Sequence, residues 1–156
     1  MSTVEDRLTR ALQLLPPRGG PLAHPEPNRL DQSLTPAQLP AAAAALIGAR
    51  WGHLAAITGL DHGPEAATLE VLYHFCGGPA IVTLRVSVPR GAPVAPSLAA
   101  LIVSATLYER EVREMFGVEF TGSPNTDRLY LPDDWPAGEH PLRKDAVFGQ
   151  PAAPAA

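Results

Sequence analysis

The two groups of residues best suited to chemistry are a cysteine with a nearby histidine and a cluster of three glutamates. Cys76 is the only cysteine, and His74 lies two positions before it, on the same face of an expected strand. A thiol beside an imidazole can act as a nucleophile with its base, but no third residue that would orient the imidazole is apparent. A structural cysteine in a hairpin turn is therefore the preferred interpretation.

The glutamates Glu109, Glu111 and Glu114 crowd one short stretch of expected helix. Paired carboxylates perform acid–base catalysis when burial raises the pKa of one of them. Arg110 and Arg113 interleave with these glutamates, and this favours a charged surface that faces solvent or a partner. Glu109 with Arg113, and Arg110 with Glu114, are spaced to form i,i+4 ion pairs on an exposed helix.

The composition argues against other kinds of site. A single cysteine rules out an intramolecular disulfide framework and any cysteine-rich zinc or iron–sulfur site within this chain. The chain lacks glycine-rich nucleotide loops, zinc-protease motifs and nucleophile-elbow motifs. No two histidines are at i,i+4 spacing, so metal ligation is disfavoured; they are His24, His53, His62, His74 and His140. We therefore expect no catalytic residue, cofactor site or metal site in this chain.

Charge and hydropathy limit the partners and the compartment. The net charge is −4 and the pI is about 5.7, which disfavours a general nucleic-acid binder. The longest uninterrupted apolar run, Ala41 to Ile47, is far shorter than the roughly 20 residues that span a bilayer. The N-terminus lacks the pattern of a secretory signal. We expect a reducing cytoplasm as the setting, with any membrane association made through a partner.

The elements that must position these residues are a small sheet and two longer helices. Apolar patterning predicts strands over 53–61, 68–75 and 80–88. The turn residues 76–79 predict a tight hairpin between the last two strands. Helices are predicted over 36–50 and 98–116; Ser97 caps the second and Gly117 closes it. The fold class is therefore α+β, a small mixed or antiparallel sheet with helices packed on it.

The two ends of the chain are predicted to be less regular. A short helix over 3–15 precedes a proline-rich linker, and we expect this helix to dock on a partner or to fray. After Phe120, turn residues leave room only for a short strand at 128–131 within an extended C-terminal arm. The predicted division is an N-terminal helix and linker over 1–32, an α+β domain over 33–146 and a disordered tail over 147–156.

Three motifs carry a resemblance to a known family. The run LYEREVREMFGVEF (107–120) is followed by DRLYLPDDW (127–135) and HPLRKD (140–145). In this order and spacing they resemble the C-subunit family of complex I (NADH:quinone oxidoreductase), which also supplies a subunit of membrane-bound complex I-like [NiFe] hydrogenases. The resemblance covers roughly residues 36–146. It implies an α+β subunit without cofactors that packs beside the hydrogenase-large-subunit homologue and the iron–sulfur small subunit.

The resemblance also implies which residues contact the partner. Glu109, Arg110 and Glu111 match the Glu-Arg-Glu signature, while Phe116 and Gly117 match the helix end. The residues that match the C-terminal motif are Asp134, Trp135, Pro141, Leu142, Arg143, Lys144 and Asp145. Arg143 and Lys144 are expected to pair with acidic groups of the partner.

The function implied is a non-catalytic scaffold in the peripheral arm of a membrane-associated oxidoreductase complex, on the cytoplasmic side of the membrane. Iron–sulfur clusters, and NiFe, quinone or NADH sites, are then expected on partner subunits. Arg113-Glu114 stands where respiratory members usually carry Tyr-Asp, which leans toward a hydrogenase-type assembly rather than an NADH:quinone oxidoreductase. The alternatives are a stand-alone soluble enzyme, which would use Cys76 or the glutamates, and a homo-oligomeric interaction module.

Overall fold

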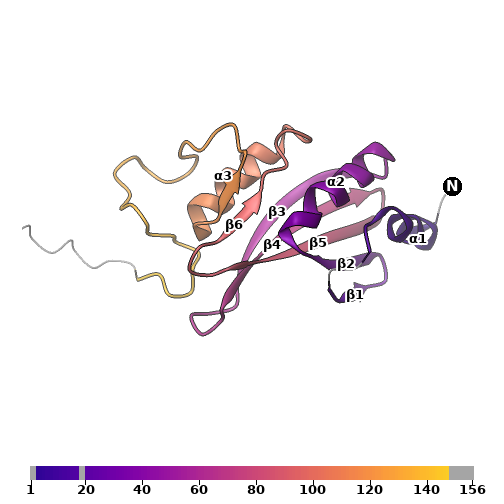
Figure 1. The fold of residues 1–156 in the computed structure, drawn as a ribbon, viewed down its shortest axis with the longest axis horizontal. Coiled ribbons are helices and arrows are strands. Elements are labelled where there is room, and N and C mark those ends of the chain that lie inside the picture. The colour runs from indigo at the N-terminus through magenta and orange to yellow at the C-terminus, as the bar shows by residue number, and fades with distance from the viewer. Residues whose placement is uncertain (1–2, 18–19, 148–156) are drawn as a thin grey trace, which may run out of the picture.

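The fold is built on a five-stranded mixed sheet, seen in a computed structural model that describes residues 3–17 and 20–147 (Figure 1). The strand order is β1-β2-β5-β4-β3, in which β2 and β5 run parallel and the other neighbours run antiparallel. The strands are β1 (Leu22–Glu26), β2 (Arg29–Leu34), β3 (His53–Asp61), β4 (Thr68–Gly77) and β5 (Ala80–Pro89). The predicted α+β class is confirmed, and the sheet is the mixed kind.

One face of this sheet forms the core, because apolar side chains alternate along the central strands. On β4 and β5 these side chains are fully buried and face each other in register: Leu69 with Val88, Val71 with Val86, Tyr73 with Leu84, and Phe75 with Val82. The predicted strands over 53–61, 68–75 and 80–88 and the hairpin between the last two are therefore confirmed.

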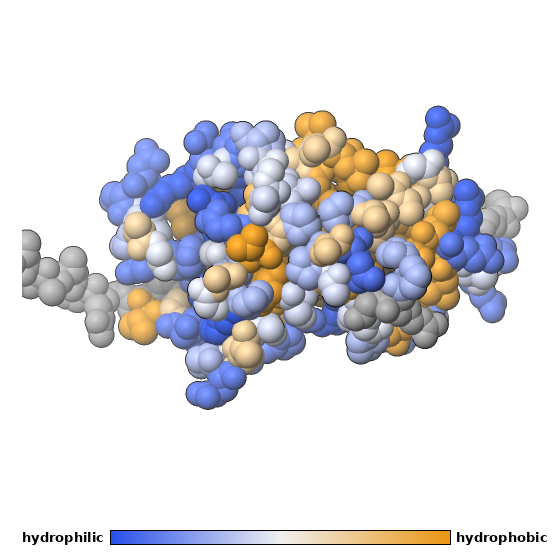
Figure 2. Space-filling view, in the orientation of Figure 1, coloured by the Kyte–Doolittle hydropathy of each residue, from blue (hydrophilic) through white to orange (hydrophobic). Residues whose placement is uncertain are grey.

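Helices cover the core face. A 3-10 turn, η1 (Pro36–Gln38), leads into α2 (Leu39–Gly48), which buries Leu39, Ala42, Ala43 and Leu46 in the core. The predicted helix over 36–50 is confirmed within these limits. Hydrophobic residues also gather on the outside of the molecule over α2 (Figure 2).

The N-terminal helix packs on its own domain, so the expectation that it would dock on a partner or fray is wrong. α1 (Val4–Leu14) buries Leu8 and Ala11 in the core. Arg7 and Trp51 bind each other reciprocally: the guanidinium donates to the Trp51 carbonyl at 2.8 Å, and the Trp51 indole donates to the Arg7 carbonyl at 2.8 Å. These two hydrogen bonds from side chain to main chain fix the helix against the loop before β3.

The proline-rich segment contains two strands, so the prediction that it has no regular structure is wrong. β2 pairs with β5 over six positions, and β1 forms the sheet edge beside β2. Pro25 lies in β1, where the β1–β2 register is irregular between Ala23 and Glu26. An edge strand accommodates a proline because one side of its backbone needs no ladder hydrogen bond.

The last helix, α3 (Ala105–Phe116), lies between two short strands, β6 (Val94–Pro96) and β7 (Glu119–Thr121), which pair in parallel. The helix begins later than predicted: residues 98–104 form successive turns, and Ser97 does not cap it. Its predicted end is confirmed, since Gly117 takes the left-handed conformation with φ 72°. Beyond β7, residues 122–147 form the C-terminal arm, which runs along α3 without regular elements; the predicted strand over 128–131 is absent from this described part.

The second face of the sheet carries a ladder of alternating charges that crosses the strands. Asp31 binds Arg29 at 2.6 Å and Arg85 at 3.4 Å, and Arg85 binds Glu70 at 2.5 Å. His62 continues the ladder with a 3.0 Å contact to Glu70. The two arginines and the two carboxylates neutralise one another across the sheet, and we call these four side chains and His62 the sheet ladder.

No helix in the described residues is both long enough and apolar enough to cross a membrane. The tail predicted over 147–156 lies outside the described residues except for Val147.

Candidate partner interface

The charged residues of α3 bind backbone groups of neighbouring segments. Glu109 is almost fully buried and accepts from the Ser97 hydroxyl at 2.6 Å and from the Leu98 amide at 2.7 Å. Burial raises the pKa of the Glu109 carboxyl, while the two donors oppose that shift. Glu109 thereby fixes the chain between β6 and α3, so the predicted charged surface is wrong at this position.

Glu114 and Arg110 hold the first part of the arm against α3. The buried Glu114 carboxylate accepts from the amides of Leu129 and Tyr130 at 2.5 and 2.9 Å. The Arg110 guanidinium donates to the carbonyls of Asp127 and Arg128 at 2.9 and 2.7 Å. Two side chains one helical turn apart thus bind the backbone of four consecutive residues of the arm.

The predicted i,i+4 ion pairs do not form, because these side chains are committed elsewhere. Arg113 contacts Glu119 of β7 at 3.0 Å and donates to the Thr126 carbonyl at 2.9 Å. Neither Glu109 nor Glu114 is bonded to an arginine among the described residues. We call Glu109, Arg110, Arg113 and Glu114 the α3 clamp.

The HPLRKD motif caps the carboxyl end of α3, where helix carbonyls lack partners within the helix. The last three carbonyl groups of the helix each have a partner in the motif. The His140 ring contacts the Glu114 carbonyl through Nδ1 at 2.9 Å, and the Leu142 amide donates to the Met115 carbonyl at 3.0 Å. The Arg143 guanidinium donates to the Phe116 carbonyl at 2.7 Å. The Nε of Arg143 is thus used within the chain, and the pairing of Arg143 with an acidic group of a partner stays a prediction.

The end of the arm is fastened to the sheet by Asp61. This buried carboxylate accepts from Arg90 at 2.5 and 3.0 Å, from the Lys144 amide at 2.9 Å and from the Gly63 amide at 2.8 Å. Arg90 also contacts Asp145 at 2.9 Å. The Arg90 guanidinium holds the pKa of the Asp61 carboxyl well below its usual range. Sequence reasoning missed Asp61 and Arg90, because they lie far from the arm in the chain.

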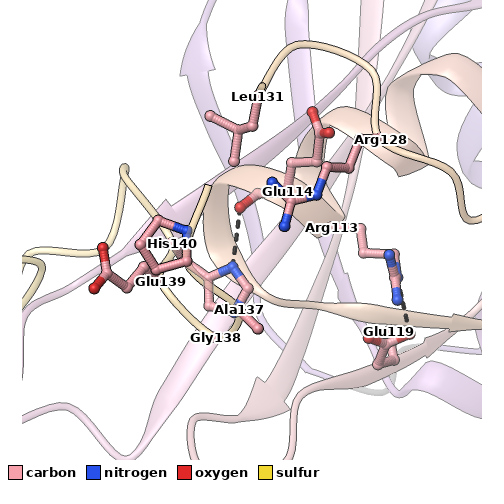
Figure 3. A pocket seen from close by; sticks show the side chains of 10 residues that line it. Arg113, Glu114, Glu119, Arg128, Leu131, Ala137, Gly138, Glu139 and His140 are labelled. Atoms are coloured by element: carbon pink, nitrogen blue, oxygen red, sulfur yellow. Dashed lines mark hydrogen bonds and ion pairs between the residues drawn. The ribbon is translucent and has the colours of Figure 1, made fainter. Parts of the chain in front are cut away.

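The middle of the arm is held by its own side chains. Arg128 donates to the carbonyls of Pro132 and Trp135 at 2.5 and 2.7 Å, and the Trp135 indole donates to the Glu139 carbonyl at 3.0 Å. Between α3, β7 and this part of the arm lies an open cavity of 310 Å³, lined by Arg113, Arg128 and His140 among others (Figure 3). The arm is therefore shaped before any partner binds.

The predicted interface residues separate into two sets. Phe116 and Gly117 serve the fold: the Phe116 ring occupies the space that a side chain at Gly59 would need, and a Cβ on Gly117 would clash with the His140 ring. Side chains available to a partner include those of Glu111, Asp134, Leu142 and Lys144, of which Asp134, Leu142 and Lys144 are exposed. Exposed apolar residues in the same part of the molecule add to this set; they are Leu101, Val103, Leu107 and Tyr130.

The cysteine and its neighbouring histidine are not arranged as a nucleophile and base. The two ring nitrogens of His74 contact the hydroxyls of Thr58 and Thr83 at 3.1 and 3.0 Å. Burial and the nearby Arg29 lower the pKa of His74 and favour its neutral form. Cys76 is a partly buried free thiol, and in the described part of the chain no three metal-binding side chains cluster.

Comparison with known proteins identifies the family of this chain. Residues 33–152 match the family model described as the respiratory-chain NADH dehydrogenase, 30 Kd subunit. The C subunit of the NADH-quinone oxidoreductase of Roseiflexus sp. is 37% identical over 102 residues, which are 64% of this chain and 58% of the relative. The chain thus spans somewhat over half the length of such relatives.

A second relative is the formate hydrogenlyase subunit 5 of Escherichia coli, 45% identical over 74 residues; these are 47% of this chain and only 13% of that protein. Among solved structures, a trypsin-resistant fragment (1–134) of Nqo5 superposes with a TM-score of 0.66 at 28% identity, covering 76% of this chain and 98% of the fragment. Relatives thus occur as subunits of more than one kind of oxidoreductase complex. The family model spans most of the chain and includes the α3 clamp and the capping motif, so this protein belongs to the respiratory-chain NADH dehydrogenase 30 kDa subunit family.

Proposed function

We propose that this chain is a non-catalytic scaffold subunit of a membrane-associated, complex I-like oxidoreductase. Its role is to dock the hydrogenase-large-subunit homologue of that complex, with the iron–sulfur small subunit as a further neighbour. The α3 clamp and the C-terminal arm form the docking region in this proposal.

The observation that carries the proposal is the fixed shape of an arm without regular structure. Glu114, Arg110 and Asp61 bind backbone groups along it, yet the arm leaves Tyr130 and Leu142 64% and 55% exposed. Interfaces favour aromatic and apolar side chains on a surface that is already ordered, since little conformational entropy is then lost on binding. An arm held in this way serves recognition better than catalysis.

The redox centres belong to other subunits in this proposal. Iron–sulfur clusters, with NiFe, quinone or NADH sites according to the type of complex, are assigned to the partners. The relatives include both an NADH-quinone oxidoreductase subunit and a formate hydrogenlyase subunit. In this proposal the partner chains therefore determine the electron donor and the electron acceptor of the complex. The subunit is placed on the cytoplasmic side of the membrane and is held there through those partners.

Affinity purification of the tagged chain from detergent-solubilised membranes of its native host tests the proposal. We expect mass spectrometry to identify a hydrogenase-large-subunit homologue together with an iron–sulfur subunit. Recovery of NADH-binding subunits, or their absence, then assigns the type of complex. Recovery of the chain alone, as a monomer or homo-oligomer, would contradict the scaffold role.

A further inference from the structure

The geometry points to a specific recognition site within the proposed docking region. We propose that the groove between β3 and α3 receives one apolar side chain of the partner, while Glu111 at its rim pairs with an adjacent arginine or lysine of the same partner segment. This inference rests on the proposed function, which it deepens by naming the chemistry of the partner.

The groove lies at the end of the sheet, where β3 is the terminal strand. It has a volume of 140 Å³ and is lined on the strand side by Ile57, Thr58 and Gly59. On the helix side it is lined by Glu111, Val112, Met115 and Phe116, and Leu142 of the arm closes one end. A cavity of about 150 Å³ with apolar walls accommodates benzene, so this groove suits one aromatic or branched aliphatic side chain.

Glu111 distinguishes this groove from an ordinary surface depression. It is half-buried, and its side chain has no hydrogen bond or ion pair within the described residues. The other charged side chains of α3 are all engaged by the chain itself, through the α3 clamp. A partner that covered the groove without supplying a cation would leave the Glu111 carboxylate desolvated and unpaired, which is strongly unfavourable.

Two exposed apolar side chains belong to the same region as the groove. Leu107 is one turn before Glu111 on α3 and is 53% exposed, while Leu142 is 55% exposed. An apolar centre with a single charge at its rim is the usual layout of an interface hot spot. The occupant that satisfies the whole site is therefore a protein segment with an apolar and a basic residue side by side.

Photo-crosslinking in the assembled complex identifies the occupant. A benzoylphenylalanine is introduced at Leu107 or at Leu142, and at Tyr130 as a position on the arm outside the groove. We expect the position in the groove, Leu142, and the position one turn before Glu111, Leu107, to capture a peptide of the large-subunit homologue in which an arginine or lysine adjoins an apolar residue. Capture of such a peptide from another subunit would retain the groove site but overturn the proposed docking partner. Capture at Tyr130 alone would overturn the groove site and retain the docking partner.

Charge substitutions provide the quantitative test, measured as affinity of the chain for the captured partner. Glu111→Gln should weaken binding by about thirtyfold or more, and Glu111→Lys should weaken it further. Glu65→Lys is the matched control, because Glu65 is exposed in a turn away from the groove, and its effect should stay within about twofold. Equal affinities for Glu111→Lys and Glu65→Lys would overturn the proposal. Circular dichroism would confirm that Glu111 variants fold, as expected for a side chain without internal partners.

Discussion

The sheet ladder and the α3 clamp use the same kinds of charged residue in opposite ways. In the ladder, carboxylates and guanidinium groups bind each other, as Asp31 does with Arg29 and Arg85. In the clamp most bonds run to main chain: Glu114 accepts from amides and Arg110 donates to carbonyls of residues 127–130, and only Arg113 also forms an ion pair, with Glu119. The ladder joins strands that backbone hydrogen bonds already join, whereas the clamp holds chain that lies outside the helices and strands.

This difference indicates which charged side chains contribute most to the stability of the fold. An exposed ion pair contributes little, because water replaces each partner easily. A buried carboxylate that binds two amides is harder to replace, since its loss leaves those amides without acceptors. In the ladder, the small contribution of an exposed pair applies only to the outer end, because His62 is exposed whereas Asp31 in the centre is buried. We therefore expect substitutions on the arm side to cost more than substitutions of equal size at the exposed end of the ladder.

The largest effect is expected at Asp61, which joins the arm to the sheet. Asp61→Ala removes the partner of Arg90 and the acceptor of two amides, so the free energy of unfolding should fall by about 3 kcal/mol or more. Urea denaturation measures this change. Asp134→Ala is the control, since this exposed side chain should change stability by less than about 0.5 kcal/mol. Similar values for the two variants would show that the bonds of Asp61 do not stabilise the fold.

The same carboxylate predicts a loss of stability in acid. Arg90 lowers the pKa of Asp61 below its ordinary value of 3.8, so the folded state binds fewer protons than the unfolded state as the pH falls through that value. The stabilisation is complete above the ordinary pKa and is lost progressively below it. Denaturation curves from about pH 5 down to about pH 2 should show this decline, and Asp61→Asn should flatten it. An unchanged slope in Asp61→Asn would assign the acid sensitivity to other carboxylates.

A smaller effect, confined to the arm, is expected at Glu114. Glu114→Ala leaves the amides of Leu129 and Tyr130 without their acceptor and should cost about 2 kcal/mol. Hydrogen exchange at these amides and tryptic cleavage after Arg128 should both become faster. Glu111→Ala is a matched control in the same helix, because it removes an equal side chain that binds no backbone. Protection of the two amides in Glu114→Ala would show that the clamp does not order the arm.

At Gly117 the effect of the left-handed conformation can be separated from the effect of the contact with the His140 ring. Gly117→Ala places a Cβ against the His140 ring in a left-handed residue, while Gly122→Ala adds a Cβ at φ 85° with no atom within 4 Å. The conformational penalty of about 1–2 kcal/mol is common to both variants. Only Gly117→Ala should displace the His140 ring from the Glu114 carbonyl, which NMR chemical shifts of that ring detect.

The smallest effect is expected at the exposed end of the ladder. His62 is 47% exposed and contacts only Glu70 within the ladder. His62→Ala should therefore change the free energy of unfolding by less than about 0.5 kcal/mol, as measured by urea denaturation. A larger loss would show that the ladder contributes to the free energy of unfolding as much as the clamp does.

Sequence patterning was sufficient for the parts of the fold that repeat with a fixed period. β4 and β5 alternate so regularly that both their limits and their buried face were predictable. β1 and β2 were missed because proline density normally indicates a linker, and nothing local shows that Pro25 lies on an edge. α3 was predicted to start too early, since the apolar spacing of residues 98–102 also suits a helix.

The contacts of the predicted interface residues could not be read from the sequence. The three motifs did locate α3 and the arm as one unit, yet the ion pairs expected within α3 are replaced by bonds to main chain. A hydrogen bond to a peptide group leaves no complementary residue type in the sequence, so its partner cannot be read from composition or spacing. Asp61 illustrates the same limit, because its partner amide belongs to Lys144, far along the chain.

The parallel pairing of β2 with β5 has a consequence for the order of folding. The register joins Arg29 to Ile81, so this contact closes a much longer loop than the β4–β5 hairpin does. Loop closure costs entropy before distant contacts repay it, and β3, β4 and β5 are neighbours in both chain and space. During synthesis β2 leaves the ribosome before β5 is made. Until then the edge of β2 that pairs with β5 stays unpaired. An unpaired strand edge favours aggregation, so the N-terminal segment is exposed to aggregation during this interval.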